Sequence, residues 1–399
     1  MSTKTIVKNN ISKKISEYLN PDYVYVPYPN DYKLLVKTNQ EVSKESPLLE
    51  KDGTVINTPV SGVIAGAKEA MINDGSTTNC IVITNNFKEK LASRKGIKRT
   101  INHYNKDEMI NLLNSKGICD YYHNQKLVDQ FKQRNEAKVL IVSGVDLEVD
   151  FYSDSFMLRD YSKEILETID ALAEIFEFKN VFLVMKNNDE NNITKYTEYL
   201  GTYPNIILKL ITSNYPSGLE HIIRKQLSNT LKEEDTVFLG VANVLAIYEL
   251  LKRERTLTER YITITGPVVE NPIVIKTKIG SQLKNIIKEQ VKLIPTESIA
   301  YLANGSMSGI EIDLDSFIIT PSTTGIYITK LSKEKESNCI NCGKCQEICP
   351  VNINPKYIMD NYQDLEKIRV SRLEKCIHCG LCNEACPSRI NLKNYLKKR

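Results

Sequence analysis

The sequence contains no long hydrophobic run, no tryptophan and only four histidines among its 399 residues. Its longest apolar stretches, such as residues 181–185, have the length of a strand, well below the roughly 20 residues that span a bilayer. Residues 1–20 are polar and lack the apolar core of a signal peptide. We therefore expect a cytoplasmic protein with no transmembrane segment, a composition that still allows peripheral association with a membrane complex.

The chain also lacks a strong charge of either sign. Its formal net charge is +4 at pH 7, and lysines and acids are interspersed, which argues against a nucleic-acid-binding face or a polybasic membrane patch. The histidines lack the spacing of metal ligands, so we assign no catalytic role to His103, His123, His221 and His378. A chain of this length with 41% apolar residues is typical of about two to four ordinary globular domains.

Cysteine is concentrated in one region, because eight of the ten cysteines lie in the last 61 residues. The pattern C-x2-C-x2-C-x3-C-P occurs twice there, which is the ligand spacing of two [4Fe-4S] clusters. In this pattern three cysteines of a tight loop bind one cluster, and the fourth binds the neighbouring cluster. We therefore expect one cluster on Cys339, Cys342, Cys345 and Cys386, and a second on Cys376, Cys379, Cys382 and Cys349.

Structural zinc and disulfide bonds are the alternatives for these cysteines. Zinc sites usually show two C-x2-C pairs well apart rather than four cysteines within eleven residues. Disulfides are not expected in a long chain without a secretory signal. Gly343 and Gly380 occupy the same place in each loop, where the missing Cβ lets backbone N–H groups turn toward cluster sulfur.

Outside the cysteine motifs, the apolar pattern predicts three further regions. Residues 21–95 show short alternating runs broken by turns, which is typical of a small β-barrel or sandwich. Residues 96–255 alternate strands with helices, which implies a mainly parallel sheet. Residues 256–330 are mixed and predict a compact β-grasp-like unit. The predicted fold class is therefore multidomain, α/β plus β.

The two ends of the chain complete this division. Residues 1–20 are expected to form a separate N-terminal segment, and residues 331–399 form the domain of the two cluster motifs, reached through a charged linker at residues 331–338. In the α/β region the apolar runs predict strands at residues 138–142, 179–184, 206–211 and 237–241, with helices at residues 162–178, 218–227 and 244–251.

Two stretches of the first β region, residues 36–42 and 58–64, resemble the barrel-sandwich fold of biotinyl and lipoyl carrier domains. Such carriers present a lysine in a hairpin between the two halves, and Lys51 occupies the corresponding turn here. It lacks the flanking methionines of a carrier lysine. We therefore expect Lys51 to have a structural role.

The order of the regions resembles that of the RnfC family. This family comprises the peripheral subunit of the bacterial Rnf ferredoxin:NAD oxidoreductase and the soluble relatives of that subunit. Within that family the chain is most similar to the PrdC-type electron-transfer proteins associated with proline reductase. The resemblance runs through both cysteine motifs and through residues 215–220, 246–249, 262–266 and 304–309. It implies a barrel-sandwich hybrid domain, a Rossmann-like α/β domain, a β-grasp (SLBB-like) domain and a ferredoxin-like domain, in that order.

The α/β region of this family is also similar to the flavin-carrying, NADH-oxidising subunit of respiratory complex I. There, backbone N–H groups of a glycine-rich loop bind FMN and nucleotide phosphates. The matching residues 119–124 of this chain are Cys-Asp-Tyr-Tyr-His-Asn and include no glycine. Side chains with a Cβ prevent the close approach of the backbone, and Asp120 repels phosphate. We therefore expect the binding of FMN and NADH to be weakened or lost.

Three residues are candidates for a remnant of a nucleotide or flavin site: Asp146, Glu148 and Asn243. Acids after the first strand contact the ribose in dinucleotide sites. Such acids equally stabilise a helix N-terminus, and Asn243 can simply cap the helix that follows it. Cys119, at the place of the lost glycine loop, is either a redox-active thiol or an inert small apolar residue.

Together these patterns predict an electron carrier or an oxidoreductase subunit. The leading hypothesis is an RnfC-like protein that passes electrons, ultimately from NADH or reduced ferredoxin, through two [4Fe-4S] clusters to a partner reductase such as proline reductase. The alternative is an FMN-containing, NADH-oxidising subunit of an Rnf-type complex. A third hypothesis is an assembly scaffold for a membrane complex.

Overall fold

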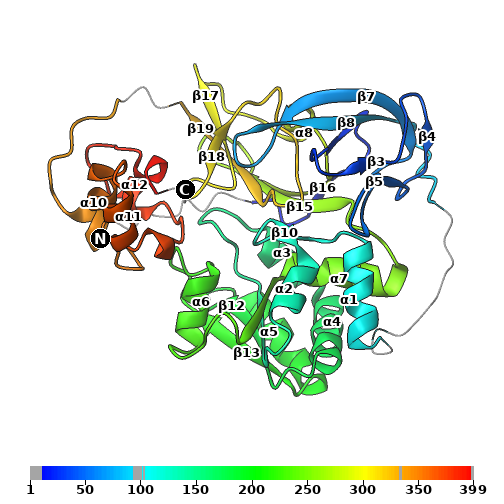
Figure 1. The fold of residues 1–399 in the computed structure, drawn as a ribbon, viewed down its shortest axis with the longest axis horizontal. Helices are drawn as coiled ribbons and strands as arrows, with labels where there is room; N and C mark the ends of the chain where they lie inside the picture. The colour runs from blue at the N-terminus through cyan, green and yellow to red at the C-terminus, as the bar shows by residue number, and fades with distance from the viewer. Residues whose placement is uncertain (1–10, 93–100, 102–103, 332–334, 397–399) are drawn as a thin grey trace.

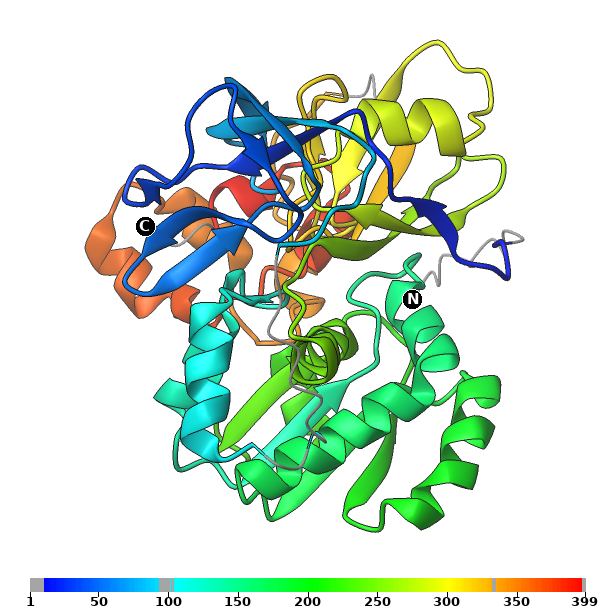
Figure 2. The same cartoon turned by 90° about the vertical axis from the view of Figure 1, so that its right-hand side faces the viewer.

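The computed structural model describes residues 11–92, 101, 104–331 and 335–396. Two β-rich regions lie side by side above an α/β region, and a cysteine-rich region projects from one side of them (Figures 1 and 2). His103, the boundary expected at residues 95 and 96, residues 332–334 of the expected linker and residues 1–10 of the expected N-terminal segment lie outside the described residues. Within the described ranges, no helix is long and apolar enough to cross a membrane.

The first β region consists of two antiparallel sheets, with strand orders β2-β8-β7-β4 and β3-β5-β6. Apolar side chains from both sheets, including Val24, Leu49 and Ile83, form one core. This packing is the small β-sandwich arrangement that the alternating pattern predicts. The strands are β2 (Tyr23–Pro27), β3 (Lys33–Leu34), β4 (Glu41–Val42), β5 (Pro47–Lys51), β6 (Thr54–Asn57), β7 (Gly62–Met71) and β8 (Thr77–Asn85).

The turn between β5 and β6 has the two-residue hairpin geometry that the sequence predicts. Asp52 and Gly53 have φ values of 49° and 74°, as a two-residue turn with both central residues in the left-handed region requires. Lys51, at the end of β5, forms an ion pair with Asp31. Its ammonium group is thus engaged with a neighbouring loop of the same region.

The α/β region is built on a four-stranded sheet with the order β13-β12-β11-β14. All three strand pairs are parallel, which confirms the predicted topology. The strands β11 (Val139–Ser143), β12 (Asn180–Lys186), β13 (Ile206–Ile211) and β14 (Thr236–Gly240) lie within three residues of the predicted positions. Leu140 and Val142 of β11 belong to one core, and Val139 and Ile141 belong to the core on the opposite face.

Helices therefore cover both faces of this sheet, as its continuous apolar strands require. The face with the larger core carries α4 and α7, which pack against each other, and the other face carries α6. The helices are α1 (Lys106–Ser115), α2 (Leu127–Gln133), α3 (Ser153–Asp160), α4 (Ser162–Ile175), α5 (Glu190–Tyr199), α6 (Glu220–Leu227) and α7 (Val241–Arg253), with a short η2 (Leu200–Thr202). A small hairpin of β9 (Cys119–Asp120) and β10 (Gln125–Lys126) precedes α2.

The third region is a six-stranded mixed sheet with the order β1-β16-β15-β19-β17-β18. Residues 16–18, which the sequence analysis assigns to a separate N-terminal segment, instead form the first strand of this sheet and pair in parallel with β16. The elements are β1 (Ser16–Tyr18), β15 (Glu259–Thr265), β16 (Ile273–Lys278), α8 (Leu283–Gln290), β17 (Ile299–Ala303), β18 (Ile310–Ile312) and β19 (Gly325–Lys330).

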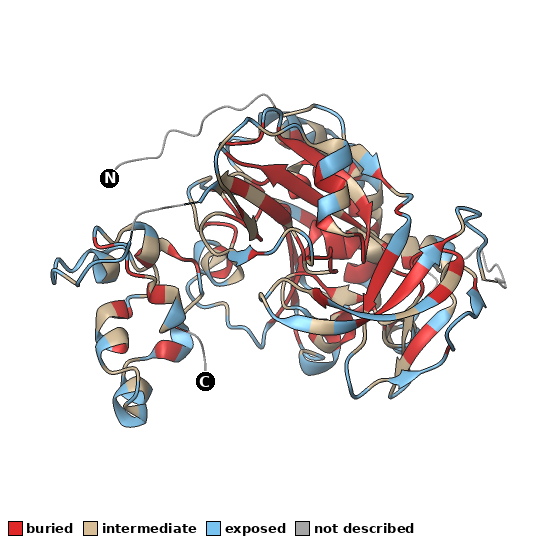
Figure 3. Ribbon diagram, turned by 90° about the horizontal axis from the view of Figure 1, so that it is seen from above, coloured by how far each residue is buried: buried red, intermediate tan, exposed pale blue. Residues whose placement is uncertain are grey.

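The cysteine-rich region consists of short helices around a small core that includes Ile353, Ile358 and Leu392 together with the cysteines. Figure 3 shows that it contains far less buried chain than the rest of the molecule. Its elements are α9 (Lys344–Glu347), α10 (Pro355–Asp360), α11 (Leu365–Val370), η3 (Leu373–Lys375), α12 (Leu381–Glu384) and η4 (Leu392–Asn394). Helices α10 and α11 lie between the two cysteine motifs.

Candidate iron-sulfur and flavin sites

The eight motif cysteines surround two separate cavities. One cavity, the outer site, is lined by Cys339, Cys342, Cys345 and Cys386. The other, the inner site, is lined by Cys349, Cys376, Cys379 and Cys382. Each cavity therefore gathers three cysteines from one motif and the last cysteine of the other motif, which are the two ligand sets that the spacing predicts.

The arrangement fits two iron-sulfur clusters better than the alternatives. All ten cysteines lie in the described ranges, and none of them is joined to another in a disulfide bond. Zinc binds thiolates at about 2.3 Å and needs its ligands gathered around one point. In the described part of the chain, no group of three potential ligands is arranged to hold a single metal ion. A cluster, by contrast, offers four separate iron corners to thiolates spread around a larger space.

The thiols of the inner site depend on a bound cation to ionise. Burial raises the pKa of Cys379 to about 11 and that of Cys382 to about 12, and the neighbouring thiols add to both shifts. Buried thiols in such surroundings are inert by themselves. Coordination to a metal deprotonates a thiol outright, because the positive charge of the metal replaces the lost hydration.

The two cysteine loops share one backbone geometry. Gly343 and Gly380 have φ values of 76° and 75° and directly precede α9 and α12. This left-handed conformation favours glycine, as predicted from their equivalent positions. The surroundings differ, because a Cβ on Gly343 would meet nothing within 4 Å, whereas one on Gly380 would lie 2.0 Å from the Met307 carbonyl oxygen.

Hydrogen bonds from Tyr215 and Lys393 attach the inner site to the rest of the molecule. The Tyr215 hydroxyl donates to the Cys379 carbonyl at 2.6 Å. The Lys393 ammonium donates to the carbonyls of Met307 and Gly309 at 3.2 and 2.8 Å. Cys379 and Cys382 are buried, whereas Cys342 of the outer site is exposed. The inner site thus faces the protein, and the outer site faces solvent.

The carboxyl ends of the parallel strands, where open α/β sheets usually bind nucleotides, are occupied by Tyr122. Its ring packs edge-on against Phe238, with 5.0 Å between the ring centroids. A Cβ on Gly240, at the end of β14, would lie only 2.9 Å from the Tyr122 ring. The Tyr122 hydroxyl donates to the Gly218 carbonyl at 3.1 Å and lies 3.3 Å from the Ser143 hydroxyl.

Asp120 is fully buried beside this ring and is saturated with hydrogen bonds. It accepts from the Tyr122 backbone N–H at 2.9 Å, the Gln130 amide at 2.9 Å and the Asn243 amide at 3.2 Å. His123 Nδ1 lies 2.7 Å from the same carboxylate. Burial opposes ionisation, but the hydrogen bonds from His123 and Gln130 outweigh it and lower the pKa of Asp120. A buried carboxylate thus stands where a flavin phosphate would need backbone N–H groups.

The three candidate remnant residues also have partners within the protein. Asp146 accepts from the Asp154 backbone N–H at 2.8 Å and from the Ser155 hydroxyl at 2.8 Å, which places it at the start of α3. Of the two roles left open for Asp146, these bonds correspond to the helix N-terminus. Asn243 donates to Asp120, although its amide oxygen is buried without a hydrogen-bond partner among the described residues.

Glu148 holds the loop at residues 304–309. It accepts from the backbone N–H groups of Met307 and Ser308 at 3.1 and 2.8 Å and from the Ser308 hydroxyl at 2.5 Å. Burial raises the pKa of Glu148 despite these bonds. Tyr122 fills the crevice, and the polar side chains around it are hydrogen-bonded to other residues of the protein. The crevice therefore does not fit FMN.

Cys119 lies next to this crevice but is not an activated thiol. Burial raises the pKa of Cys119 to about 12, and its thiol is 3.5 Å from the carbonyl of Asp120. A reactive cysteine needs a lowered pKa and an electropositive environment. Of its two possible roles, Cys119 therefore corresponds to the inert small residue.

Sequence reasoning missed the residues that join the inner site to the rest of the molecule: Tyr215, Lys393 and the loop at residues 304–309. Residues 215–220 and 304–309 carry the resemblance to RnfC, so they are visible in the sequence as motifs. Their shared role is not visible there, because the contacts join segments more than 80 residues apart along the chain.

Two family models match this chain. Residues 120–237 match the Nuo51 FMN-binding domain, and residues 338–390 match the 4Fe-4S dicluster domain. The second match covers all eight motif cysteines and confirms two [4Fe-4S] clusters as the cofactors. The first match shows that the α/β region is of the FMN-binding type, although its crevice is filled here.

Curated relatives match over most of the chain. It is 24% identical to the RnfC subunit of the ion-translocating oxidoreductase complex of Buchnera aphidicola over 362 residues, which is 85% of this chain and 75% of that protein. The same subunit of Vibrio cholerae is 24% identical over 345 residues, 82% of this chain but 44% of the relative. For the Cronobacter sakazakii protein the identity is 25%, over 56% of this chain and 30% of the relative. The chain thus spans less than half the length of the last two.

A solved structure, the NAD+-reducing [NiFe]-hydrogenase in the air-oxidized state, aligns with a TM-score of 0.47 at 12% identity over 59% of this chain and 48% of that chain. The sequence matches provide the more specific information. The chain is similar to the RnfC subunits of ion-translocating oxidoreductase complexes, and it combines an α/β region of the FMN-binding type with a C-terminal 4Fe-4S dicluster domain.

Proposed function

We propose that this protein is an RnfC-like electron-transfer protein that works through two [4Fe-4S] clusters and without a flavin. The observation that carries the proposal is that each of two cavities is lined by four cysteines from both motifs. When bound, the clusters supply one-electron oxidation and reduction. The proposed ligands are Cys339, Cys342, Cys345 and Cys386 at the outer site, and Cys376, Cys379, Cys382 and Cys349 at the inner site.

The protein residues around the two sites have different tasks in this proposal. At the inner site, Cys379 and Cys382 are buried and their loop is held by Tyr215, which excludes water and fixes the position of the thiols. At the outer site, Cys342 is exposed and the neighbouring Ile340 is 66% exposed. An exposed ligand leaves its cluster within reach of a redox partner. We therefore place the exchange with a partner protein at the outer site.

The partners and the finer domain names belong to the same proposal. We propose that electrons come ultimately from NADH or reduced ferredoxin and pass to a partner reductase such as proline reductase, as in PrdC-type proteins. The two-sheet region would be a barrel-sandwich hybrid domain and the six-stranded region an SLBB-like domain. A cytoplasmic protein with peripheral association to a membrane complex agrees with the similarity to RnfC subunits.

Iron counting tests the cluster assignment. Anaerobically reconstituted protein should contain about eight iron atoms per chain, because two clusters of four are held. Cys342→Ala and Cys379→Ala should each leave about four. Cys80→Ala is the matched control, since Cys80 is a buried cysteine outside both motifs and should leave the iron content unchanged. Colourless protein that binds zinc would contradict the proposal.

A second function, an FMN-containing NADH oxidase subunit, has one observation in its favour: residues 120–237 match the Nuo51 FMN-binding domain. Acid denaturation of the purified protein distinguishes the two proposals. We expect no flavin fluorescence in the supernatant and no bleaching of the clusters by NADH alone. Stoichiometric release of FMN would favour the second function.

A further inference from the structure

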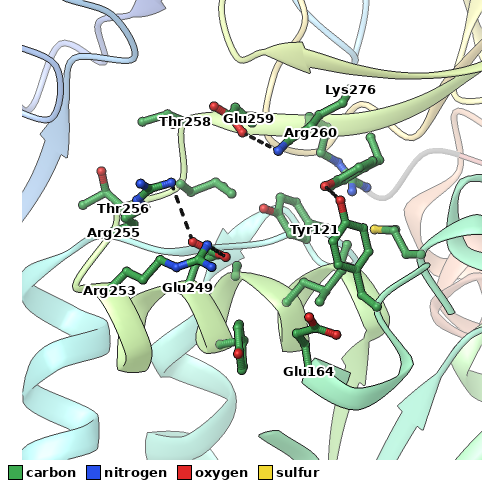
Figure 4. Close-up of a pocket in the computed structure, with 18 of the residues that line it drawn as sticks. Tyr121, Glu164, Glu249, Arg253, Arg255, Thr256, Thr258, Glu259, Arg260 and Lys276 are labelled. Carbon is green, nitrogen blue, oxygen red and sulfur yellow. Dashed lines mark hydrogen bonds and ion pairs between the residues drawn. The ribbon is translucent and has the colours of Figure 1, made fainter. Parts of the chain in front are cut away.

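A cavity of about 280 Å³ lies between helix α7 of the α/β region and strand β15 of the six-stranded sheet. It is distinct from the crevice filled by Tyr122 and from both cysteine sites. Glu249 of α7, Thr256 of the following loop and Arg260 of β15 border it from different sides (Figure 4). Pockets for small molecules begin at about this size and favour interfaces between domains.

Three buried polar atoms at this cavity have no hydrogen-bond partner among the described residues. They are Glu249 Oε2, Thr256 Oγ1 and Arg260 Nε, and only eight such side-chain atoms occur in the whole described chain. Arg260 is 3% exposed and Thr256 is 8% exposed. Buried polar groups are almost always bonded to protein, to ordered water or to a ligand. Their concentration at one cavity indicates a missing partner there.

One cation of the cavity lacks an acidic partner in the described part of the chain. Lys276 pairs with Glu259 at 2.9 Å, and Arg253 pairs with Glu249 at 2.6 Å. Arg260 forms no ion pair with any described residue. The carboxyl group that influences it most is that of Asp154, and burial together with the neighbouring Asp146 raises the pKa of Asp154.

Aromatic rings form the walls between these polar groups. The Arg260 guanidinium lies 4.1 Å from the centre of the Tyr121 ring, which fixes its direction. Tyr161 and Tyr261 are joined by a hydrogen bond of 2.7 Å between their hydroxyls, and both line the cavity. Flat, apolar walls with few polar groups select a planar ligand body.

We infer that this cavity binds a small planar organic anion that carries a hydroxyl or amino group opposite its acidic group. Arg260 and Thr256 hold the acidic group, Glu249 Oε2 accepts from the hydroxyl or amino group, and the tyrosine rings contact the body. A neutral ligand would leave Arg260 without an ion-pair partner among the described residues. An anion without a donor would leave Glu249 Oε2 with only the Arg255 guanidinium, which at 4.0 Å is too far for a hydrogen bond. The site is independent of the electron-transfer function and is tested by binding alone.

Three probes of one shape separate these requirements: 4-hydroxybenzoate has the ring, the anion and the donor, benzoate lacks the donor, and phenol lacks the anion. Isothermal titration of the full-length, cluster-loaded protein under anaerobic conditions should show saturable binding of 4-hydroxybenzoate. Benzoate and phenol should each bind about tenfold more weakly. Equal affinity for all three probes, or no binding of 4-hydroxybenzoate, would mean that the cavity holds only water and would overturn the inference.

Two conservative variants test the named residues. Thr256→Val removes an unpartnered buried hydroxyl, so the free protein should be as stable as the wild type or more stable, while the affinity for 4-hydroxybenzoate falls several-fold. Thr277→Val is its control, because the Thr277 hydroxyl is equally buried and unpartnered among the described residues but lies outside the cavity. A loss of affinity in both variants, or in neither, would contradict the assignment.

Glu249→Gln removes the acceptor charge with almost no change of shape and should weaken 4-hydroxybenzoate but leave benzoate unchanged. Glu167→Gln is the control, since both glutamates pair with a base on α7 and both side chains are 36% exposed. Of the two, Glu249 lines the cavity and Glu167 does not. If 4-hydroxybenzoate and benzoate lose affinity equally in Glu249→Gln, the Glu249 carboxylate does not accept a hydrogen bond from the hydroxyl group of the ligand.

Discussion

The two cysteine loops are nearly identical in sequence spacing and backbone conformation, yet they stand in opposite environments. Gly343 and Gly380 have almost the same φ, but only Gly380 lies against another described segment, at the carbonyl of Met307. Cys342 is exposed, whereas its counterpart Cys379 is buried. The repeat therefore specifies how thiols are presented, and residues outside the repeat decide which loop is fixed to the protein and which remains open to a partner.

The largest expected difference between the loops comes from adding one methyl group to each glycine. Gly380→Ala combines a left-handed φ with a clash against a backbone oxygen, so it should cost about 4 kcal/mol or more and detach the inner loop. Gly343→Ala carries only the conformational penalty of about 1–2 kcal/mol. Hydrogen exchange of residues 304–309 and the iron content measure the two effects. Equal losses in both variants would show that the loops are not differently docked.

The next comparison is between the lysines at the two cysteine cavities, Lys393 at the inner site and Lys356 at the outer site. Lys393 lines the inner site and donates to two carbonyls of the loop at residues 304–309, and each such charged hydrogen bond is worth about 1.5–3 kcal/mol. Lys393→Met should therefore destabilise the docked arrangement by about 3 kcal/mol. Lys356 lines the outer site and pairs with exposed Asp360, so Lys356→Met should leave thermal stability unchanged. Anaerobic thermal unfolding checks both, and the reverse order would contradict the comparison.

Tyr215→Phe should have a smaller effect that is confined to the inner site. It removes the hydrogen bond to the Cys379 carbonyl and should cost about 1 kcal/mol. Because outer-shell hydrogen bonds tune a metal site, the midpoint potential of one cluster should change while the other stays fixed. Tyr357→Phe is the control, because the Tyr357 side chain is exposed on helix α10. A redox titration in which both potentials move together would show that the sites are not separable.

The smallest expected difference is kinetic. An iron chelator should remove the outer cluster several-fold faster than the inner one, because solvent reaches Cys342 but not Cys379 or Cys382. Iron release from the wild-type protein should then follow two phases of equal amplitude. Cys342→Ala, which is expected to lack the outer cluster, should show only the slow phase. One phase in the wild type would mean that burial does not control access.

Local patterns are predictable from the sequence where one segment decides its own structure. The strands at β11 and β13 are apolar runs that need no partner to be recognised, and the presence of two [4Fe-4S] clusters follows from the repeated cysteine spacing. Helix α5 escapes prediction because its sequence is mostly polar and buries only Asn192 and Tyr196. Strand β1 escapes it because three residues carry no readable alternation, and only the pairing with β16 defines this strand.

The candidate site is predictable only in part, because the remaining contacts are tertiary. The missing glycines at residues 119–124 predict a weakened flavin site, but not that Tyr122 fills the crevice against Phe238. The acids after β11 suggest nucleotide contacts, whereas the partner of Glu148 lies 160 residues away at Ser308. The cavity at Arg260 carries no motif, since its polar atoms come from separate elements that meet only in the folded chain.

Glu148 connects the α/β region to the loop at residues 304–309, and through that loop to the cysteine-rich region. Its carboxylate binds Met307 and Ser308, and the Met307 carbonyl in turn touches Gly380 and Lys393 beside the inner cysteines. The edge of the parallel sheet and the inner thiols are thus joined by an unbroken relay of direct contacts. A partner that tilts the cysteine-rich region must therefore break or distort these contacts.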